Sequence, residues 1–266
     1  KEWGDVSMAA YRAALTLELL HNASLVHDDI VDESDMRRGR PSVRSIYGNK
    51  TAVLAGDYLL SSALDSAALS GDIKIVNNVS LLGKQLSEGE LLQLFNTQNT
   101  DFSEEKYYHI IRLKTASLFS AATRIGAISS GASDDAVKQM DRLGDIIGLC
   151  FQIRDDIFDY YDNDTGKPSG NDMHEGKLTL PVLYVLNTTN DETLHAIATR
   201  VRAGSATADE IAILVRATKE QGGIRYADDQ MERLSLEAKA LIANFRNPEV
   251  KQALSLYIDF VSERTN

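Results

Sequence analysis

The sequence DDIVD at residues 28–32 recurs as DDIFD at residues 155–159. Each copy closes a long stretch with apolar residues at helical spacing, and a polar loop with Arg or Lys follows it. Residues four apart share one face of a helix, so the outer carboxylates of each copy lie one above the other. Like charges repel there, and the C-terminal end of a helix is already partly negative. One copy would fit a solvated helix end equally well, but two copies predict a bound cation.

The rest of the chain has the composition of a helical protein. Its 266 residues are 43% hydrophobic, enough for one large core or two modest ones, and no shift in composition marks a boundary. The four prolines lie at expected helix edges, and no convincing strand occurs. We therefore predict one all-α domain over residues 1–266, a bundle of long helices. The chain enters its first helix almost at once, so we expect further N-terminal helices to be missing.

The spacing of apolar residues sets the expected helices. They cover residues 5–32, 51–68, 73–95, 103–128, 134–159, 180–186, 193–202, 208–221, 224–244 and 248–263. Residues 33–42 and 162–177 are expected to be loops.

Charge and cysteine content exclude several kinds of partner. The net charge of −11 argues against nucleic acid and against an anionic membrane surface, which both need a basic protein. The single cysteine, Cys150, excludes an intrachain disulfide and favours a cytoplasmic location. No run of eighteen uncharged apolar residues occurs, so we expect no integral membrane segment.

The acidic clusters and their loops together predict a diphosphate site. Carboxylates are hard oxygen ligands of the kind Mg²⁺ prefers, and substrate phosphates usually complete its coordination. Basic side chains in the following loops are suited to phosphate oxygens: Arg37 and Arg38 after the first cluster, Lys167 and Lys177 after the second. The alternative is that these cations only neutralise neighbouring acids.

Polar residues one or two turns before the clusters are further candidates. His21 and Ser24 precede Asp28 on its face, and Gln152 precedes Asp156. A buried core histidine and a ligand remain equally open for His21. Lys114 and Thr115 interrupt an apolar helical stretch, and the lysine either extends to solvent or contacts an anion in a cavity.

Five segments carry a resemblance to a known family. They are LVHDDIVDESDMRRGRPS at 25–42, LAGDYLL at 54–60, RLKTASLF at 112–119, FQIRDDIFDYYDNDTGKPSGNDMHEGKLTLP at 151–181 and GGIRYA at 222–227. The chain resembles the trans-type isoprenyl diphosphate synthases, most closely the medium- and long-chain, octaprenyl-type members. The resemblance implies an all-α isoprenoid synthase fold around a deep central cavity and a homodimer. It also implies Mg²⁺-dependent condensation of isopentenyl diphosphate with an allylic diphosphate, farnesyl or geranylgeranyl.

The same resemblance assigns roles to individual residues. Metal ligands would be Asp28, Asp32 and Asp155, with Asp29, Asp156 and Asp159 as ligands or supporting partners. The allylic diphosphate would contact Arg37, Lys114, Thr115, Gln152, Lys167 and Lys177. Isopentenyl diphosphate would contact His21 and Arg38. Catalysis would depend most on Asp28, Asp32, Asp155, Lys114 and Lys177. The family's upstream Gly-Gly-Lys and Arg-Pro motif is absent here.

Product length should depend on the residues just before the first cluster. In the family, bulky aromatic residues there stop elongation early, whereas this chain has Ala23 and Ser24. We expect a medium or long polyprenyl product of the kind used for quinone side chains. The alternatives are a short-chain farnesyl or geranylgeranyl diphosphate synthase, a class I terpene cyclase, and a non-catalytic subunit of a heteromeric synthase. The second DDxxD cluster argues against the last two, because a cyclase usually carries a different second metal motif.

Overall fold

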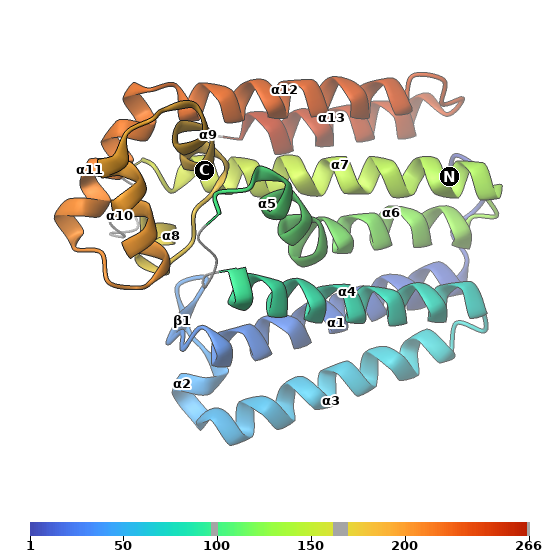
Figure 1. The fold of residues 1–266 in the computed structure, drawn as a ribbon. Coiled ribbons are helices and arrows are strands. Elements are labelled where there is room, and N and C mark those ends of the chain that lie inside the picture. The colour runs from blue at the N-terminus through green and yellow to red at the C-terminus, as the bar shows by residue number, and fades with distance from the viewer. Residues whose placement is uncertain (97–100, 162–169, 265–266) are drawn as a thin grey trace. The chain divides into compact units, whose positions relative to one another are not determined.

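The computed structural model describes residues 1–96, 101–161 and 170–264. These residues form helices joined by short connections, together with one hairpin of two-residue strands, which confirms the all-α prediction (Figure 1). They divide into two compact units. The first unit contains Lys1–Leu86 and Leu118–Gly144, and the second contains Ser87–Ser117 and Asp145–Asn266. The boundaries fall inside two long helices and near the start of a third.

The first unit begins with the helix that ends in the first acidic cluster. Ser7 caps it by accepting a hydrogen bond from the amide of Ala10. The elements of the unit are α1 (Met8–Val31), β1 (Met36–Arg37), β2 (Arg40–Pro41), α2 (Val43–Tyr47), α3 (Asn49–Ala68), the first part of α4 (Ile73–Asn96), α6 (Ser117–Ser129) and the first part of α7 (Asp134–Phe158). The two strands pair antiparallel, with Met36 opposite Pro41.

Small residues bring α1 and α3 close together. Ala52, Gly56, Ala63 and Ala67 of α3 are all buried. A Cβ on Gly56 would lie 2.3 Å from the His27 ring, so a larger residue there would displace this side chain. Leu20 of α1 joins the same apolar core, which also contains Ile75, Val79, Leu82 and Ile125. This packing fixes the end of α1 and therefore the first acidic cluster.

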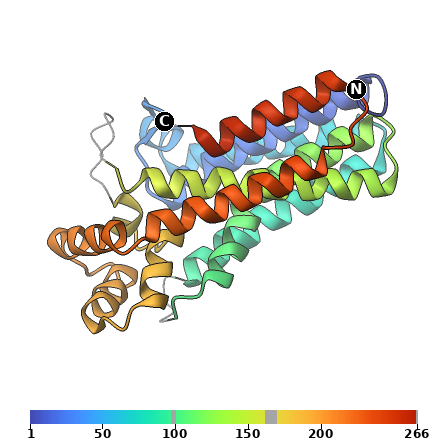
Figure 2. The ribbon, with the colours of Figure 1, turned by 90° about the horizontal axis from the view of Figure 1, so that it is seen from above.

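The second unit carries the other acidic cluster. Its elements are the end of α4, α5 (Glu104–Ile111), the π-helix η1 (Arg112–Ala116), the end of α7, α8 (Asn171–His174), α9 (Leu180–Thr188), α10 (Glu192–Arg202), α11 (Ala208–Glu220), α12 (Gly223–Leu241) and α13 (Pro248–Glu263). The apolar helix α9 is the centre of the core and packs against α12. Tyr184 of α9 stacks on Tyr226 of α12 with ring centroids 4.2 Å apart. The long helices α12 and α13 run antiparallel beside each other (Figures 1 and 2).

The expected helix bounds agree with the structure to within a few residues, and the differences concern short elements. The expected loop 33–42 contains the β1–β2 hairpin, and the expected loop 162–177 contains the one-turn helix α8. Two-residue strands and a four-residue helix are too short to show a periodic pattern. In the part of the chain that the structure describes, no helix combines the length and apolar character needed to cross a bilayer.

Candidate active site

The first acidic cluster ends α1 with its middle carboxylate buried. Asp29 is only 3% exposed, and its Oδ1 accepts a 2.6 Å hydrogen bond from Nε of Arg37 on β1. Asp28 is half-buried and Asp32 is exposed. Arg37 therefore neutralises a neighbouring acid, which was the alternative reading of the basic loop, while the outer carboxylates remain more accessible.

The hairpin turn presents Arg38 in a strained conformation. Arg38 has φ = 50° and Gly39 has φ = 74°, as expected for the two central residues of a type I′ turn. The left-handed region is unfavourable for a bulky residue such as arginine and often marks a functional position. Burial, and next the nearby positive charge of Arg38, lower the pKa of the His21 imidazole below its ordinary value of 6.5. His21 and Arg38 are thus electrostatically linked, as expected if both contact one anion.

The second acidic cluster also buries its middle carboxylate, but neutral groups hold it. Asp156 is 2% exposed. The Tyr107 hydroxyl donates to its Oδ2 at 2.6 Å, and Nε2 of Gln152 donates to its Oδ1 at 2.8 Å. The Thr115 hydroxyl donates in turn to Oε1 of Gln152 at 2.7 Å. Three elements, α5, η1 and α7, are therefore connected through one carboxylate.

The outer carboxylates of this cluster have different partners. Asp155 pairs with Arg264, just beyond α13. Asp159 accepts a hydrogen bond of 3.1 Å from the backbone N–H of Asp172, at the start of α8. Asp172 is thereby held near the cluster, although no pattern in the sequence indicates a role for it.

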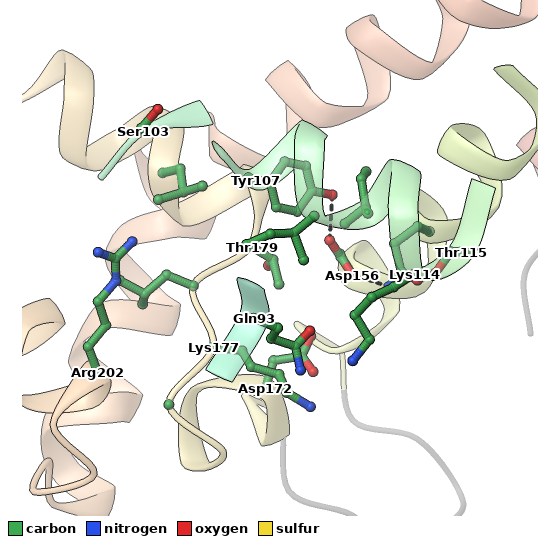
Figure 3. A pocket seen from close by; sticks show the side chains of 16 residues that line it. Gln93, Ser103, Tyr107, Lys114, Thr115, Asp156, Asp172, Lys177, Thr179 and Arg202 are labelled. Carbon is green, nitrogen blue, oxygen red and sulfur yellow. Dashed lines mark hydrogen bonds between the residues drawn. The ribbon is translucent and has the colours of Figure 1, made fainter. Parts of the chain in front are cut away.

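A cavity of about 190 Å³ adjoins the second cluster (Figure 3). Lys114, Thr115, Gln152, Asp156 and Lys177 line it, so it brings together five of the residues expected at the site. Other lining residues that sequence reasoning did not place there include Tyr107, Asp172 and Arg202. Figure 3 shows Lys114, Lys177 and Asp172 around the middle of the cavity, with Arg202 at one side.

Lys114 reaches this cavity from a π-helix. The five residues Arg112–Ala116 form η1, and π-helical turns inside helices are frequent at functional sites. Nζ of Lys114 forms a 2.6 Å ion pair with Oε2 of Glu90 on α4. A Cβ on the neighbouring Gly89 would lie 2.9 Å from the Lys114 backbone nitrogen, so glycine allows α4 to approach η1. Lys114 therefore does not extend to solvent as a simple surface residue.

The electrostatics of the second cluster fit a bound divalent cation. Burial, followed by the charge of Asp172, raises the pKa of Asp156 well above its ordinary range. Burial and the charge of Asp159 raise the pKa of Asp172 to about 7. Burial is the largest cause of both shifts and neighbouring carboxylates add to it, so a bound metal ion would favour the ionised forms of these carboxyl groups. No closed group of three His, Cys, Asp or Glu ligands forms among the described residues. An open set suits Mg²⁺, which uses few carboxylates together with water and phosphate.

The remaining predicted residues lie in the first unit or outside the described chain. His21, Ala23, Ser24, Arg37 and Arg38 all belong to α1 or the hairpin that follows it. Lys167 lies outside the described residues. Tyr107 was missed because its helical spacing is equally typical of a core residue. Glu90 and Arg202 were missed because they come to the site only through tertiary packing.

Comparison with known proteins identifies the family. The sequence profile of polyprenyl synthetases matches residues 4–217. The chain belongs to the polyprenyl synthetase family. It is therefore an enzyme of the trans-prenyltransferase type, as the sequence predicted. Octaprenyl diphosphate synthase of Escherichia coli is 37% identical over 194 residues, 72% of this chain and 60% of that protein.

Solved structures of polyprenyl synthetases share the fold. Geranylgeranyl pyrophosphate synthase from Bacteroides thetaiotaomicron has 48% identity and a TM-score of 0.90, covering 99% of this chain and 84% of that one. Polyprenyl synthase from Caulobacter crescentus, complexed with calcium and isoprenyl diphosphate, has 29% identity and a TM-score of 0.91, covering 100% and 81%. These similarities confirm the isoprenoid synthase fold of this polyprenyl synthetase.

Proposed function

We propose that this polyprenyl synthetase condenses isopentenyl diphosphate with farnesyl or geranylgeranyl diphosphate to form a longer all-trans polyprenyl diphosphate, with Mg²⁺ as cofactor. The observation that carries the proposal is the shared construction of the two acidic clusters. In each, protein groups hold a buried middle Asp, while the outer carboxylates are less buried. A solvated helix end would not need such support.

The outer and middle carboxylates of each cluster would have different roles. Asp28, Asp32, Asp155 and Asp159 would hold Mg²⁺, and the buried Asp29 and Asp156 would support them. Bound Mg²⁺ would neutralise the diphosphate and favour its departure as an anion. Burying the middle carboxylates fixes the ends of α1 and α7, so the outer oxygens are positioned before substrate arrives.

The basic and polar side chains would bind the two diphosphates. The diphosphate of the allylic substrate would contact Arg37, Lys114, Thr115, Gln152, Lys167 and Lys177. The Lys114 and Lys177 ammonium groups would stabilise the charge that develops on the leaving diphosphate. His21 and Arg38 would hold isopentenyl diphosphate, whose double bond attacks the allylic cation. The isopentenyl double bond is thus the nucleophile, and the released diphosphate accepts the proton that is then lost, so the protein supplies no nucleophile.

The test is a condensation assay with isopentenyl diphosphate, farnesyl diphosphate and Mg²⁺. We expect chain elongation, and a fall of at least about 100-fold in turnover for Asp28→Ala and for Asp155→Ala. The control Asp135→Ala removes an exposed acid at the start of α7 and should leave turnover unchanged. A cyclised hydrocarbon, or no elongation by the unmodified protein, would refute the proposal.

Small residues near the end of α1 support a medium or long product of the kind used for quinones. Ala23 is buried on the same face as Leu20, and the Ser24 hydroxyl donates to the carbonyl of His21 at 2.9 Å. Neither side chain would block a growing chain.

A short-chain product is the second candidate, because the Bacteroides geranylgeranyl pyrophosphate synthase is 48% identical. The expected result for Ala23→Phe or Ser24→Phe is a shorter product. An unmodified enzyme that stops at 15 or 20 carbons would favour the short-chain candidate.

A homodimer is also part of the proposal. Several large apolar side chains of α1 and α3 are between 52% and 74% exposed: Tyr11, Leu15, Leu54 and Tyr58. Exposing so much apolar surface to water is unfavourable for a monomer. A second copy would bury such a surface. Sedimentation of the Tyr58→Glu variant should show a shift toward monomer if this face is used. The single buried Cys150 is compatible with a cytoplasmic location, which we propose as well.

A further inference from the structure

The side chain of Arg264 packs against the second acidic cluster and is held there by several specific contacts. Arg264 follows α13 directly, and its backbone leaves the helix in an extended conformation. Its guanidinium pairs with Oδ1 of Asp155 and donates at 3.2 Å to the carbonyl of Phe151. The side chain is only 14% exposed. It is therefore far from an ordinary surface arginine.

Aromatic rings complete this position. The guanidinium carbon lies 4.1 Å from the centroid of the Phe151 ring and 5.6 Å from that of Phe158. Cations are attracted to aromatic faces at such distances. Arg154 of α7 makes the reciprocal contact, because its guanidinium donates to the carbonyl of Ser262 in α13. The end of α13 is thus attached to α7 next to the cluster.

The contact with Arg264 leaves the carboxylate of Asp155 partly accessible. The Asp155 side chain is still 41% exposed, so another cation could approach it. The Arg264 position is also imperfect, since its buried Nε has no hydrogen-bond partner among the described residues. An incompletely satisfied guanidinium is easier to displace.

We propose that Arg264 is a positioning residue that holds Asp155 in the metal-free enzyme and is displaced when a divalent cation binds to that carboxylate. The proposal rests on the proposed role of Asp155 as a metal ligand. Arginine and metal compete for the same carboxylate, so each weakens the binding of the other. The end of α13 would then be less firmly attached to α7 in the metal-loaded enzyme than in the free one.

The competition gives two measurements that do not depend on turnover. Mn²⁺ binding to the whole chain can be followed by electron paramagnetic resonance, with and without inorganic pyrophosphate. Arg264→Gln should bind Mn²⁺ about fivefold more tightly, the lower end of typical coupling between sites. The metal-free variant should also unfold at a lower temperature, and Mg²⁺ should raise its Tm by more than it raises that of the unmodified protein. Arg264→Lys keeps the positive charge, so its Mn²⁺ affinity and its Tm should lie between those of Arg264→Gln and the unmodified protein.

Two further variants serve as controls. Lys239→Ala breaks the Lys239–Asp259 ion pair between α12 and α13, so it tests for general loosening of these helices. It should leave Mn²⁺ affinity unchanged. Asp155→Asn should weaken Mn²⁺ binding. If Asp155→Asn has no effect, the metal role of Asp155 is wrong and the proposed function is in question. If Asp155→Asn weakens binding but Arg264→Gln does not tighten it under either condition, the proposed function stands and the role of Arg264 is refuted.

Discussion

The hydroxyl of Tyr107 donates a 2.6 Å hydrogen bond to the carboxylate of Asp156. Its counterpart in the first cluster is the 2.6 Å contact from Arg37 to Asp29. One motif therefore supports its middle Asp with neutral donors, and the other supports it with a charged donor. A neutral donor leaves the negative charge of Asp156 uncompensated. The two clusters differ in their demand for a cation although their sequences are nearly the same.

Replacing Tyr107 by Phe should destabilise the protein. The change removes one of the two side-chain donors to a buried carboxylate, and such a loss typically costs about 1–3 kcal/mol. The free energy of unfolding can be measured with urea. In the control Tyr226→Phe, the lost hydroxyl donates to Glu104 at 2.8 Å in a less buried setting, so the loss should be smaller. Equal losses in the two variants would contradict the special burial of Asp156.

Two glycines of α4 provide a matched test of the close approach to η1. A Cβ on Gly89 would lie 2.8 Å from Cβ of Leu113, whereas a Cβ on Gly83 would meet no atom within 4 Å. Gly89→Ala should therefore displace Lys114 and lower both thermal stability and turnover. Gly83→Ala should be neutral or stabilising by up to about 1 kcal/mol, because alanine favours helix. A neutral Gly89→Ala variant would show that α4 and η1 are not in close contact.

The ionisation of His21 should report on the neighbouring anion site. Its pKa should lie below 6.5 in the free protein and rise in Arg38→Ala, because the positive charge of Arg38 contributes to the lowering. Adding isopentenyl diphosphate should also raise it. Proton NMR can follow the five histidines, with a His21→Gln variant to assign the signal. No response of this signal to isopentenyl diphosphate would argue against His21 as a binding residue.

The same shift has a consequence for stability. Below pH 6.5 the unfolded chain binds a proton at His21 before the folded chain does. The contribution of His21 to stability is therefore fully present above pH 6.5 and is lost as the pH falls toward the folded pKa. In His21→Gln, the unfolding free energy should depend less on pH in this range.

Arg38 should show a conflict between stability and binding. Its φ of 50° is unfavourable for arginine, whereas asparagine tolerates this region well. Arg38→Asn should stabilise the fold by up to about 1 kcal/mol and weaken the binding of isopentenyl diphosphate. Thermal denaturation and calorimetric titration measure the two effects. Unchanged affinity would remove Arg38 from the proposed site.

Cys150 should be unreactive in the folded protein. Burial raises the pKa of its thiol to about 12, so only about one molecule in 10⁴ carries the reactive thiolate at pH 8. A chromogenic disulfide reagent should modify it slowly in buffer and quickly in guanidinium chloride. Fast reaction in buffer would show that the α7–α13 packing around it opens readily.

The long elements and the cluster positions could be predicted because they follow from local chemistry. Ser7 and Ser103 cap their helices by accepting hydrogen bonds from the amides of Ala10 and Lys106, and the ends of α1 and α7 carry the acids. Tyr107 could not be assigned, because a tyrosine at apolar spacing looks the same whether its hydroxyl contacts water or Asp156. Its partner is 49 residues away in sequence. Such a contact depends on packing that periodicity does not encode.

The basic residues show a second limit of sequence reasoning. Arg37 and Lys177 were expected to bind phosphate, and in the structure each pairs with an acid, Asp29 and Glu175 respectively. The two roles do not exclude each other, because a cation that pairs with an acid in the free protein can contact a diphosphate once the substrate is bound. The sequence alone cannot tell whether such a cation pairs with an acid or with a diphosphate. Which partner it contacts depends on whether the substrate is bound.

The π-helix Arg112–Ala116 amounts to one extra residue wound into a helix. An α-helix turns by about 100° per residue, whereas a π-helical turn turns less per residue and so takes up its extra residue with little change in the helical register that follows. Lys114 and Thr115 lie in this widened turn, and both line the cavity. Deleting one residue of η1 should therefore restore regular α-helix and turn these two side chains away from the cavity, while the helix itself continues. The extra residue is thus a constraint on the site more than on the helix, and we expect its loss to lower turnover more than it lowers stability.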